Sequence, residues 1–311
     1  MTAPAEEQDG ASAEGCEGTY RVVHTTKYRF EDEASSCTVE ARLKTRELPH
    51  QQCLFHQLVV RPLATARREW TDTFGNRVTG FTVPEAHRTL EVTAINVVRT
   101  SPRSAPALDA APPWEGVRRR IEDRAQRDDL EPFLGESPLV DPDAAAAEFA
   151  RACFGPGRPV LAGARDLATR IHRELAYDPG STTVATPAAE ALRLRRGVCQ
   201  DFAHLAIAGL RSLGLAARYV SGYLDTSALK GPNARPGGDA SHAWFSVYVP
   251  DLGWVDVDPT NDRLAADGYV TLAWGRDYSD VAPLQGAVAG GGGRHTVSVS
   301  VDVGRDEAVG A

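Results

Sequence analysis

The hydrophobic pattern of the chain changes abruptly near residue 100, and this change limits the possible folds more than any other feature. Between residues 19 and 99, short runs rich in Val, Thr and aromatic side chains alternate apolar and polar positions, as half-buried β-strands do. The Pro- and Ala-rich stretch 101–113 follows, and after it apolar residues recur at helical spacing. Later runs such as SHAWFSVYV, GWVDVDP and TVSVSVDV indicate strands again. We therefore expect an α+β chain in which an all-β module precedes a mixed core.

Breaks in this pattern predict five parts. They are a disordered N-terminus (1–18), a β domain (19–100), a linker and helical connection (101–143), a mixed core (144–285), and a Gly-rich connector with a C-terminal strand (286–311). Inside the β domain, Gly75 and Asn76 predict a hairpin turn. In the core, Thr186 is expected to cap a helix whose first residue is Pro187. The glycine run near the C-terminus precedes a strand, so we expect a flexible connector and no phosphate-binding loop.

The composition is that of a soluble globular protein and argues against several classes of partner. Of the 311 residues, 42% are hydrophobic and 24% are charged, which suffices for a sizeable core. The net charge of −8 disfavours nucleic acid and anionic membranes as partners. The N-terminus lacks the features of a signal peptide and no run reaches membrane-spanning length, so we expect a cytoplasmic protein. The five scattered cysteines include no CxxC pair, so neither a disulfide framework nor a metal or other cofactor is expected.

Cys199 stands directly before an amphipathic stretch that predicts a helix. The apolar residues of that stretch fall on one stripe: Phe202, Leu205, Ala206, Gly209, Leu210 and Leu213. Gly214 is expected to end the helix in a left-handed conformation. At the opposite end, unpaired N–H groups and the positive end of the helix dipole favour a thiolate and can hold an oxyanion. The alternative, a buried structural cysteine, fits Cys153 in its Ala- and Phe-rich helix better than it fits Cys199.

Two later strands supply a candidate base and a candidate carboxylate. His242 begins the strand HAWFSVYV, and Asp258 lies near the end of the strand WVDVDP. Their even separation means that a hairpin loop of odd length places both on one face, and a five-residue loop at 248–252 would place them directly opposite. An aspartate at that distance fixes the imidazole tautomer and supports its charged form. Asp256 shares the face and is the nearest rival.

Each of these residues also has an ordinary interpretation. A histidine at a strand start is often a surface residue, and an Asp-Pro-Thr sequence is often a turn. His204 is interpreted as a helix-surface or core histidine. A zinc site formed by Cys199, His204 and His242 is disfavoured, because Cys-x4-His is not a usual zinc spacing. The case for catalysis is that three separate local contexts supply a nucleophile, a base and a carboxylate.

Two stretches of the core resemble a known family. TPAAEALRLRRGVCQDFAHLAIAGLRSLGLAARYVSGYL, followed by SHAWFSVYVPDLGWVDVDPTND, is similar to the catalytic core of bacterial transglutaminase-like proteins, and the similarity extends over residues 165–285. The resemblance implies a papain-like fold with a catalytic triad of Cys199, His242 and Asp258, the last being the aspartate before Pro-Thr. The β-rich region containing LVVRP and DTFGNRV resembles the N-terminal region that accompanies such cores in bacteria.

Two features of animal transglutaminases have no counterpart in this sequence. No Trp lies between Trp114 and Cys199 to stabilise the oxyanion, so we expect the Cys199 N–H and a second, unassigned donor to do so. No acidic cluster resembles a calcium loop, so calcium activation is not implied.

The triad and the resemblance together imply an enzyme that attacks an amide or isopeptide carbonyl of a peptide or protein, through a thioacyl intermediate on Cys199. Water is the favoured acceptor, which gives a cysteine protease or amidase, because the polar loop 225–241 is poorly suited to exclude water from the intermediate. A protein-glutamine transglutaminase and a catalytically silent scaffold are the alternatives. Trp244 and Trp254 are expected to form part of a wall around the intermediate.

The strand and loop after the nucleophile helix complete the expected cleft. Arg218, Tyr219, Gly222 and Tyr223 lie on that strand, where each either lines the cleft or packs in the core. Loop 225–241 is Gly- and Pro-rich and serves either as a lid or as a solvated linker.

Overall fold

The computed structural model describes residues 17–122, 129–226, 241–290 and 293–305. The disorder expected at the N-terminus therefore falls almost entirely outside the described residues, as does most of the proposed lid, since residues 227–240 are not among them. Of the expected N-terminal segment, Gly18 already belongs to the first strand.

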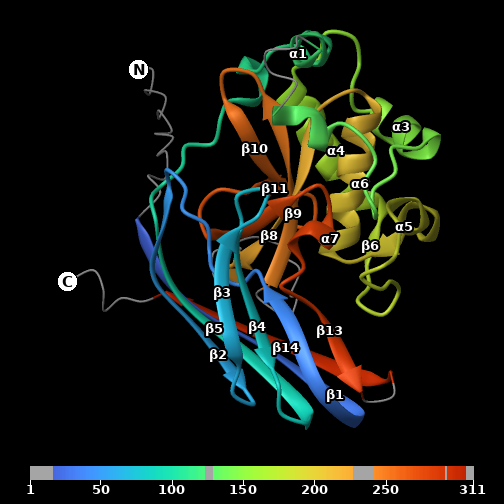
Figure 1. Ribbon diagram of the computed structural model, residues 1–311. Coiled ribbons are helices and arrows are strands. Elements are labelled where there is room, and N and C mark those ends of the chain that lie inside the picture. Colours follow the sequence, from blue (N-terminus) through green and yellow to red (C-terminus); the bar gives the residue numbers. More distant parts are fainter. Residues whose placement is uncertain (1–16, 123–128, 227–240, 291–292, 306–311) are drawn as a thin grey trace, which may run out of the picture.

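The N-terminal module is a long antiparallel sheet arranged around one central strand (Figure 1). Its strands are β1 (Gly18–Ala41), β2 (Gln51–Arg61), β3 (Thr65–Thr71), β4 (Arg77–Val83) and β5 (His87–Thr100). Two strands predicted separately, TYRVVHTTKYRF and CTVEARLKT, are joined in one continuous strand, β1, which ends at Ala41 and so takes in only the first part of the second prediction. The predicted hairpin turn joins β3 to β4, where Gly75 has a φ of +79° and donates its N–H to Asp72 O at 3.0 Å. Only glycine adopts that φ without strain.

The C-terminal segment joins the N-terminal sheet. Strands β13 (Leu284–Gly290) and β14 (His295–Arg305) pair in succession with β1, antiparallel, along its length (Figure 1). The expected Gly-rich connector is thus partly wrong, because residues 286–290 belong to a strand. At Gly286 an added Cβ would lie 2.3 Å from Thr38 O, so the glycine permits a close backbone approach that a larger residue would prevent.

The core places helices on one face of a five-stranded sheet of order β11-β10-β9-β8-β12 (Figure 1). The strands are β8 (Ala217–Leu224), β9 (Ser241–Val249), β10 (Gly253–Asp258), β11 (Arg263–Leu264) and β12 (Tyr269–Gly275), with a small parallel pair of β6 (Ala176–Tyr177) and β7 (Arg196–Gly197). The helices are α1 (Trp114–Ile121), α3 (Ala144–Arg151), α4 (Val160–Glu174), α5 (Ala188–Leu194), α6 (Cys199–Ser212) and α7 (Tyr278–Val281), with short turns η1 (Leu108–Ala110) and η2 (Glu131–Phe133). In the described part of the chain, no helix has the length and apolar character needed to cross a membrane.

Two local predictions in the core need correction. The predicted single apolar stripe of α6 is incomplete, because the helix is central and is buried on all sides from Gln200 to Arg211. Thr186 does not cap α5, which begins after Pro187. Its hydroxyl instead accepts the Thr183 N–H at 2.9 Å and closes a turn ahead of the helix. Gly214 follows α6 with a φ of +76°, as predicted.

Candidate active site

Cys199 is the first residue of α6, and the chain reaches it through a tightly fastened turn. Asp201 accepts the Val198 N–H at 2.8 Å and the Thr182 hydroxyl at 2.7 Å, so one carboxylate joins the helix start to a neighbouring loop. Gly197 is required here, because an added Cβ would lie 2.7 Å from the Asp201 side chain. The thiol is therefore held at a defined helix N-terminus, as the sequence predicted.

The backbone around this thiol can bind an anion. Among the described residues, the N–H groups of Cys199 and Gln200 have no acceptor, as expected for the first turn of a helix. The Gln200 side chain is engaged elsewhere, with its amide donating to Val184 O at 2.9 Å. The helix start therefore offers backbone donors beside a partly exposed thiol.

His242 and Asp258 lie on one sheet face, but not directly opposite each other. Val249 pairs with Gly253 and Phe245 with Val257, which leaves the loop 250–252 between the strands. The loop is odd in length, as the shared face requires, but it is shorter than the predicted 248–252. The two residues are therefore diagonal neighbours, and His242 Nε2 lies 2.7 Å from Asp258 Oδ2.

His242 connects the carboxylate to the thiol. Its ring is hydrogen-bonded to Asp258, and Cys199 lies close enough to contribute to the pKa shift of the imidazole. Because Nε2 faces Asp258, Nδ1 is the ring nitrogen that remains for the thiol. Burial alone would lower the pKa of His242, but the charge and hydrogen bond of Asp258, together with the contact to Cys199, raise it to about 10. The imidazolium is the favoured form at neutral pH.

Asp258 is fully buried, and its two oxygens accept five hydrogen bonds. Oδ1 accepts the N–H groups of Thr260 at 2.8 Å and Asn261 at 3.2 Å. Besides His242, Oδ2 accepts the Asn261 amide and the Tyr269 hydroxyl, each at 2.7 Å. Burial raises the pKa of Asp258, but the charge of His242 and these hydrogen bonds lower it to about 2. The carboxylate therefore stays charged without access to water.

Sequence reasoning missed Asn261 and Tyr269. Asn261 had a local signal, since it lies in the turn directly after Asp258 in VDPTND. Tyr269 had none, because it comes from β12 at the far edge of the sheet. The turn is also held from the helical side, where His172 donates to Thr260 O at 2.8 Å and Arg165 contacts Asp262.

Asp256, the rival carboxylate, has a separate environment. It accepts the Ser246 hydroxyl and forms an ion pair with Arg103 of the linker at 3.3 Å. Ser246 lies opposite it on β9, four residues along from His242. Four strand residues span about 13 Å. The structure thus brings Asp258 to the imidazole and leaves Asp256 away from it.

A cavity of about 790 Å³ lies at that distant end of the sheet. Arg218 lines it between the rings of Trp254 and Trp274, with centroid distances of 4.4 and 3.7 Å. The expectation that Trp254 shields the thiol is therefore wrong, because its ring faces this cavity. Trp244 is fully buried, and its ring centroid lies 6.1 Å from that of His242. It therefore packs beside the imidazole and lines no solvent-accessible surface.

The other residues of β8 serve packing. Tyr219 is buried against His204, with ring centroids 5.0 Å apart. Tyr223 is buried and forms a 3.0 Å hydrogen bond with His24 of the N-terminal module. An added Cβ at Gly222 would lie 2.3 Å from Val270 O. His204 is a core histidine, and burial lowers its pKa to about 4.

The remaining described cysteines are not at helix starts. Cys153 is buried, which raises the pKa of its thiol. Cys37 is also buried in the β module, where its sulfur lies 3.1 Å from His87 Nε2, and burial raises its pKa as well. Over the described ranges, no group of three or more His, Cys, Asp or Glu side chains is arranged to hold a metal ion.

The fold and the site define a class of protein: a papain-like α+β core with a cysteine at a helix N-terminus, a histidine beside it and an aspartate behind. Residues 147–259 match the transglutaminase-like superfamily, and residues 20–99 match the bacterial transglutaminase-like N-terminal region. The chain belongs to the transglutaminase-like superfamily.

Relatives and solved structures agree with this membership. An uncharacterised protein of Mycobacterium tuberculosis is 40% identical over 294 residues, which cover 91% of this chain and 92% of the relative. A protein-glutamine gamma-glutamyltransferase of Pseudomonas aeruginosa is 28% identical over 153 residues, 43% of this chain and 22% of that protein. A Cytophaga hutchinsonii protein provisionally designated a cysteine protease has a similar fold, with a TM-score of 0.70, 23% identity and coverage of 94% of this chain and 92% of that one.

Proposed function

We propose that this protein is a thiol-dependent hydrolase that cleaves an amide bond of a peptide or protein, with Cys199 as nucleophile, His242 as general base and acid, and Asp258 as the residue that orients His242. The observation that carries the proposal is the 2.7 Å hydrogen bond of His242 Nε2 with the buried carboxylate of Asp258, on an imidazole that lies beside the Cys199 thiol. The raised pKa of His242 supports it, because an imidazolium stabilises an adjacent thiolate.

The reaction follows from these groups. The Cys199 thiolate adds to the substrate carbonyl, and the oxyanion that forms is stabilised by the Cys199 N–H at the start of α6. His242 then gives its Nδ1 proton to the leaving amine, and the thioacyl enzyme remains. Neutral His242 takes a proton from water as the water attacks the thioester, and collapse of the second intermediate releases the acid and restores the thiolate.

The alternative acceptor is an amine, which would make the protein a transglutaminase. The named activity of the Pseudomonas relative favours this alternative, although the matched region is only 22% of that protein. Hydrolysis is preferred because Trp254, expected to shield the thioester, faces a different cavity.

The nucleophile is tested without a substrate. Native protein is treated with limiting iodoacetamide at neutral pH, and the label is mapped by mass spectrometry. Cys199 should react first, and Cys37 is the matched control because it also contacts a histidine but is buried. Preferential labelling of Cys37, Cys53 or Cys153 would refute the assignment, and an unreactive Cys199 would favour a silent scaffold.

The acceptor is tested with a peptide library that contains glutamine and amide groups, incubated with and without a large excess of a primary amine. Cleaved or deamidated peptides in both conditions are expected for a hydrolase. Amine adducts at glutamine, with little cleavage, would instead establish transfer and leave the triad intact. The Cys199→Ala variant is the control for adventitious activity.

We also propose the cytoplasm as the compartment of this protein. Fractionation of cells that express the tagged chain tests it, with a cytoplasmic and an exported marker as controls.

A further inference from the structure

The carboxylate of the triad depends on a strand that is not part of its own hairpin. Among its described partners, Thr260 and Asn261 follow Asp258 directly in the chain, whereas Tyr269 comes from β12, across the sheet. The Tyr269 ring passes over Trp244, with centroids 5.3 Å apart and planes 82° apart. The hydroxyl can reach Asp258 only while β12 keeps its position.

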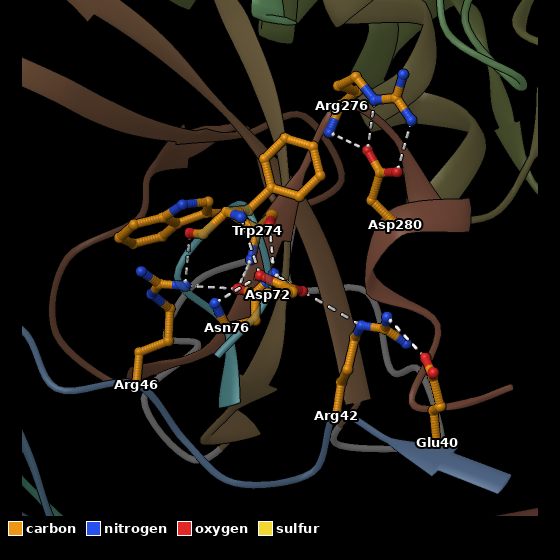
Figure 2. A network of polar contacts seen from close by, with 9 residues as sticks. Glu40, Arg42, Arg46, Asp72, Asn76, Trp274, Arg276 and Asp280 are labelled. Carbon is orange, nitrogen blue, oxygen red and sulfur yellow. Dashed lines mark hydrogen bonds and ion pairs between the residues drawn. The ribbon is translucent and has the colours of Figure 1, made fainter. Parts of the chain in front are cut away.

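β12 is an edge strand of the core sheet, and the N-terminal module occupies its outer edge. Gln51 donates its amide to Thr271 O and accepts the Thr271 N–H, both at 2.7 Å. Asn76 does the same at Trp274, donating to its carbonyl at 2.9 Å and accepting its N–H at 3.0 Å (Figure 2). Each side-chain amide thus satisfies a backbone donor and acceptor as a neighbouring strand would.

These two amides are themselves fixed. Both are buried, Gln51 at 2% and Asn76 at 0% exposure. Asp72 accepts the backbone N–H of Asn76 at 2.8 Å and the Asn76 side-chain amide at 3.0 Å (Figure 2). Arg46 donates to the amide oxygen of Asn76. Apolar contacts add to the attachment, since Val270 and Leu272 belong to the same buried cluster as the strands of the module.

We infer that the N-terminal module is a working part of the active site: Gln51 and Asn76 hold β12, and β12 holds Tyr269 against Asp258. Tyr269 is a positioning residue, because it acts on the reacting groups through the carboxylate and His242. This inference rests on the proposed catalytic role of the triad, and it gives the module a function other than binding a partner.

Charged and titratable groups face His242 and Tyr269 from the elements packed against them. His242 faces Cys199 of α6, Asp258 of β10 and Tyr269 of β12. On the outer side, Arg263 of β11 lies 5.9 Å from the Tyr269 ring. Removal of the Tyr269 hydroxyl takes one donor from a charged carboxylate and so disfavours its ionised form.

The first test is Tyr269→Phe, which keeps the ring against Trp244. The rate of Cys199 alkylation by iodoacetamide is measured from pH 1.5 to pH 9, with the folded fraction checked by circular dichroism at each pH. The midpoint of the acid limb should rise by about one pH unit, the lower end of what one hydrogen bond to a charged group contributes, because four donors remain. Tyr248→Phe, on the same strand as His242 but distant from it, is the matched control and should leave the midpoint unchanged.

The second test asks whether the module acts through Tyr269. Gln51→Met removes the amide at similar volume and, like Tyr269→Phe, should raise the midpoint of the acid limb of Cys199 alkylation. In the Tyr269→Phe background, the same change should add no further shift. Gln57→Met, an exposed glutamine on the same strand, is the control. Should Gln51→Met fail to fold, Gln51→Asn shortens the side chain by one methylene so that its amide no longer reaches both Thr271 groups, and it should shift the midpoint in the same direction.

A purely structural role gives a different result. Gln51→Met would then lower the melting temperature but leave the midpoint unchanged, or it would shift the midpoint equally in both backgrounds, and either outcome overturns the inference. Failure of the proposed amidase activity is separable, because alkylation needs no substrate. A Cys199 that does not react in the parent protein would refute the triad itself.

Discussion

At the scale of single residues, two aspartates on one strand face have different surroundings. Asp258 is buried with hydrogen bonds from His242, Asn261 and Tyr269, whereas Asp256 contacts Ser246 and Arg103. The strand pattern places both on the same face, and the hairpin register selects the one that meets the imidazole. The register therefore decides which carboxylate supports the imidazolium.

Asp258→Asn should slow alkylation of Cys199 at neutral pH by about tenfold or more, because without the charge and hydrogen bond of Asp258 burial should lower the pKa of His242 below neutrality, and a pKa about one unit below the working pH leaves about a tenth of the imidazolium. Asp256→Asn, matched in chemistry and strand, should change the rate by less than about twofold. Rates are compared at equal fractions of folded protein, checked by circular dichroism. A larger effect of Asp256→Asn would show that the wrong carboxylate was chosen.

The ionisation of His242 should make stability depend on pH. Its pKa is raised from 6.5 to about 10, so its contribution is complete below pH 6.5 and is lost as the pH rises through about 10. Asp258, with its pKa lowered to about 2, contributes above its ordinary pKa and loses that contribution as the pH falls through about 2. Urea unfolding at pH 6, 8 and 10 should show the parent losing its advantage over Asp258→Asn with rising pH. A constant difference would contradict the assignment.

At the scale of elements, the proposed active site depends on the contact between β8 and its neighbours. Gly222 lies on β8 opposite His242, and Val270 O of β12 approaches it from the other side. The Trp244 ring also covers this glycine. The small residue thus lets β8, β9 and β12 meet directly beside His242.

Gly222→Ala should destabilise the protein by about 1–3 kcal/mol, because the added methyl group would lie 2.3 Å from Val270 O and 2.4 Å from the Trp244 ring. The free energy of unfolding is measured in urea, and Cys199 alkylation is followed in parallel. Gly116→Ala is the control, since an added Cβ there meets only the end of an Arg119 side chain, at 4.0 Å. Equal stabilities of the two variants would refute the steric argument.

At the scale of the whole molecule, the first and last strands that the structure describes belong to one sheet. β14 pairs with β1 from Tyr20 to Phe30, and β13 pairs with β1 from Ala34 to Ala41. Val301 and Val303 of β14 pack against the buried cluster of the module. The chain thus leaves the module, builds the core and returns to complete the module.

Removal of residues 284–311 should lower the melting temperature by more than about 4 °C, because β1 would lose its partners along one whole edge. Removal of residues 306–311 alone keeps both strands and is the matched control. Thermal unfolding followed by circular dichroism measures both. Unchanged stability of the shorter chain would mean that the two C-terminal strands contribute little.

Local patterns alone determined much of this protein. Strand alternation defined the β module, helical spacing placed Cys199 at a helix start, and the parity of positions 242 and 258 placed both residues on one face. These signals depend on neighbours within a few residues, so they can be read from the chain. The tertiary structure decided the rest: the hairpin register that chose Asp258, the return of β13 and β14 to β1, and the reach of Tyr269 from β12 to the carboxylate. Each of these joins segments distant in sequence, whose pairing is set by packing and by backbone hydrogen bonds that no local pattern specifies.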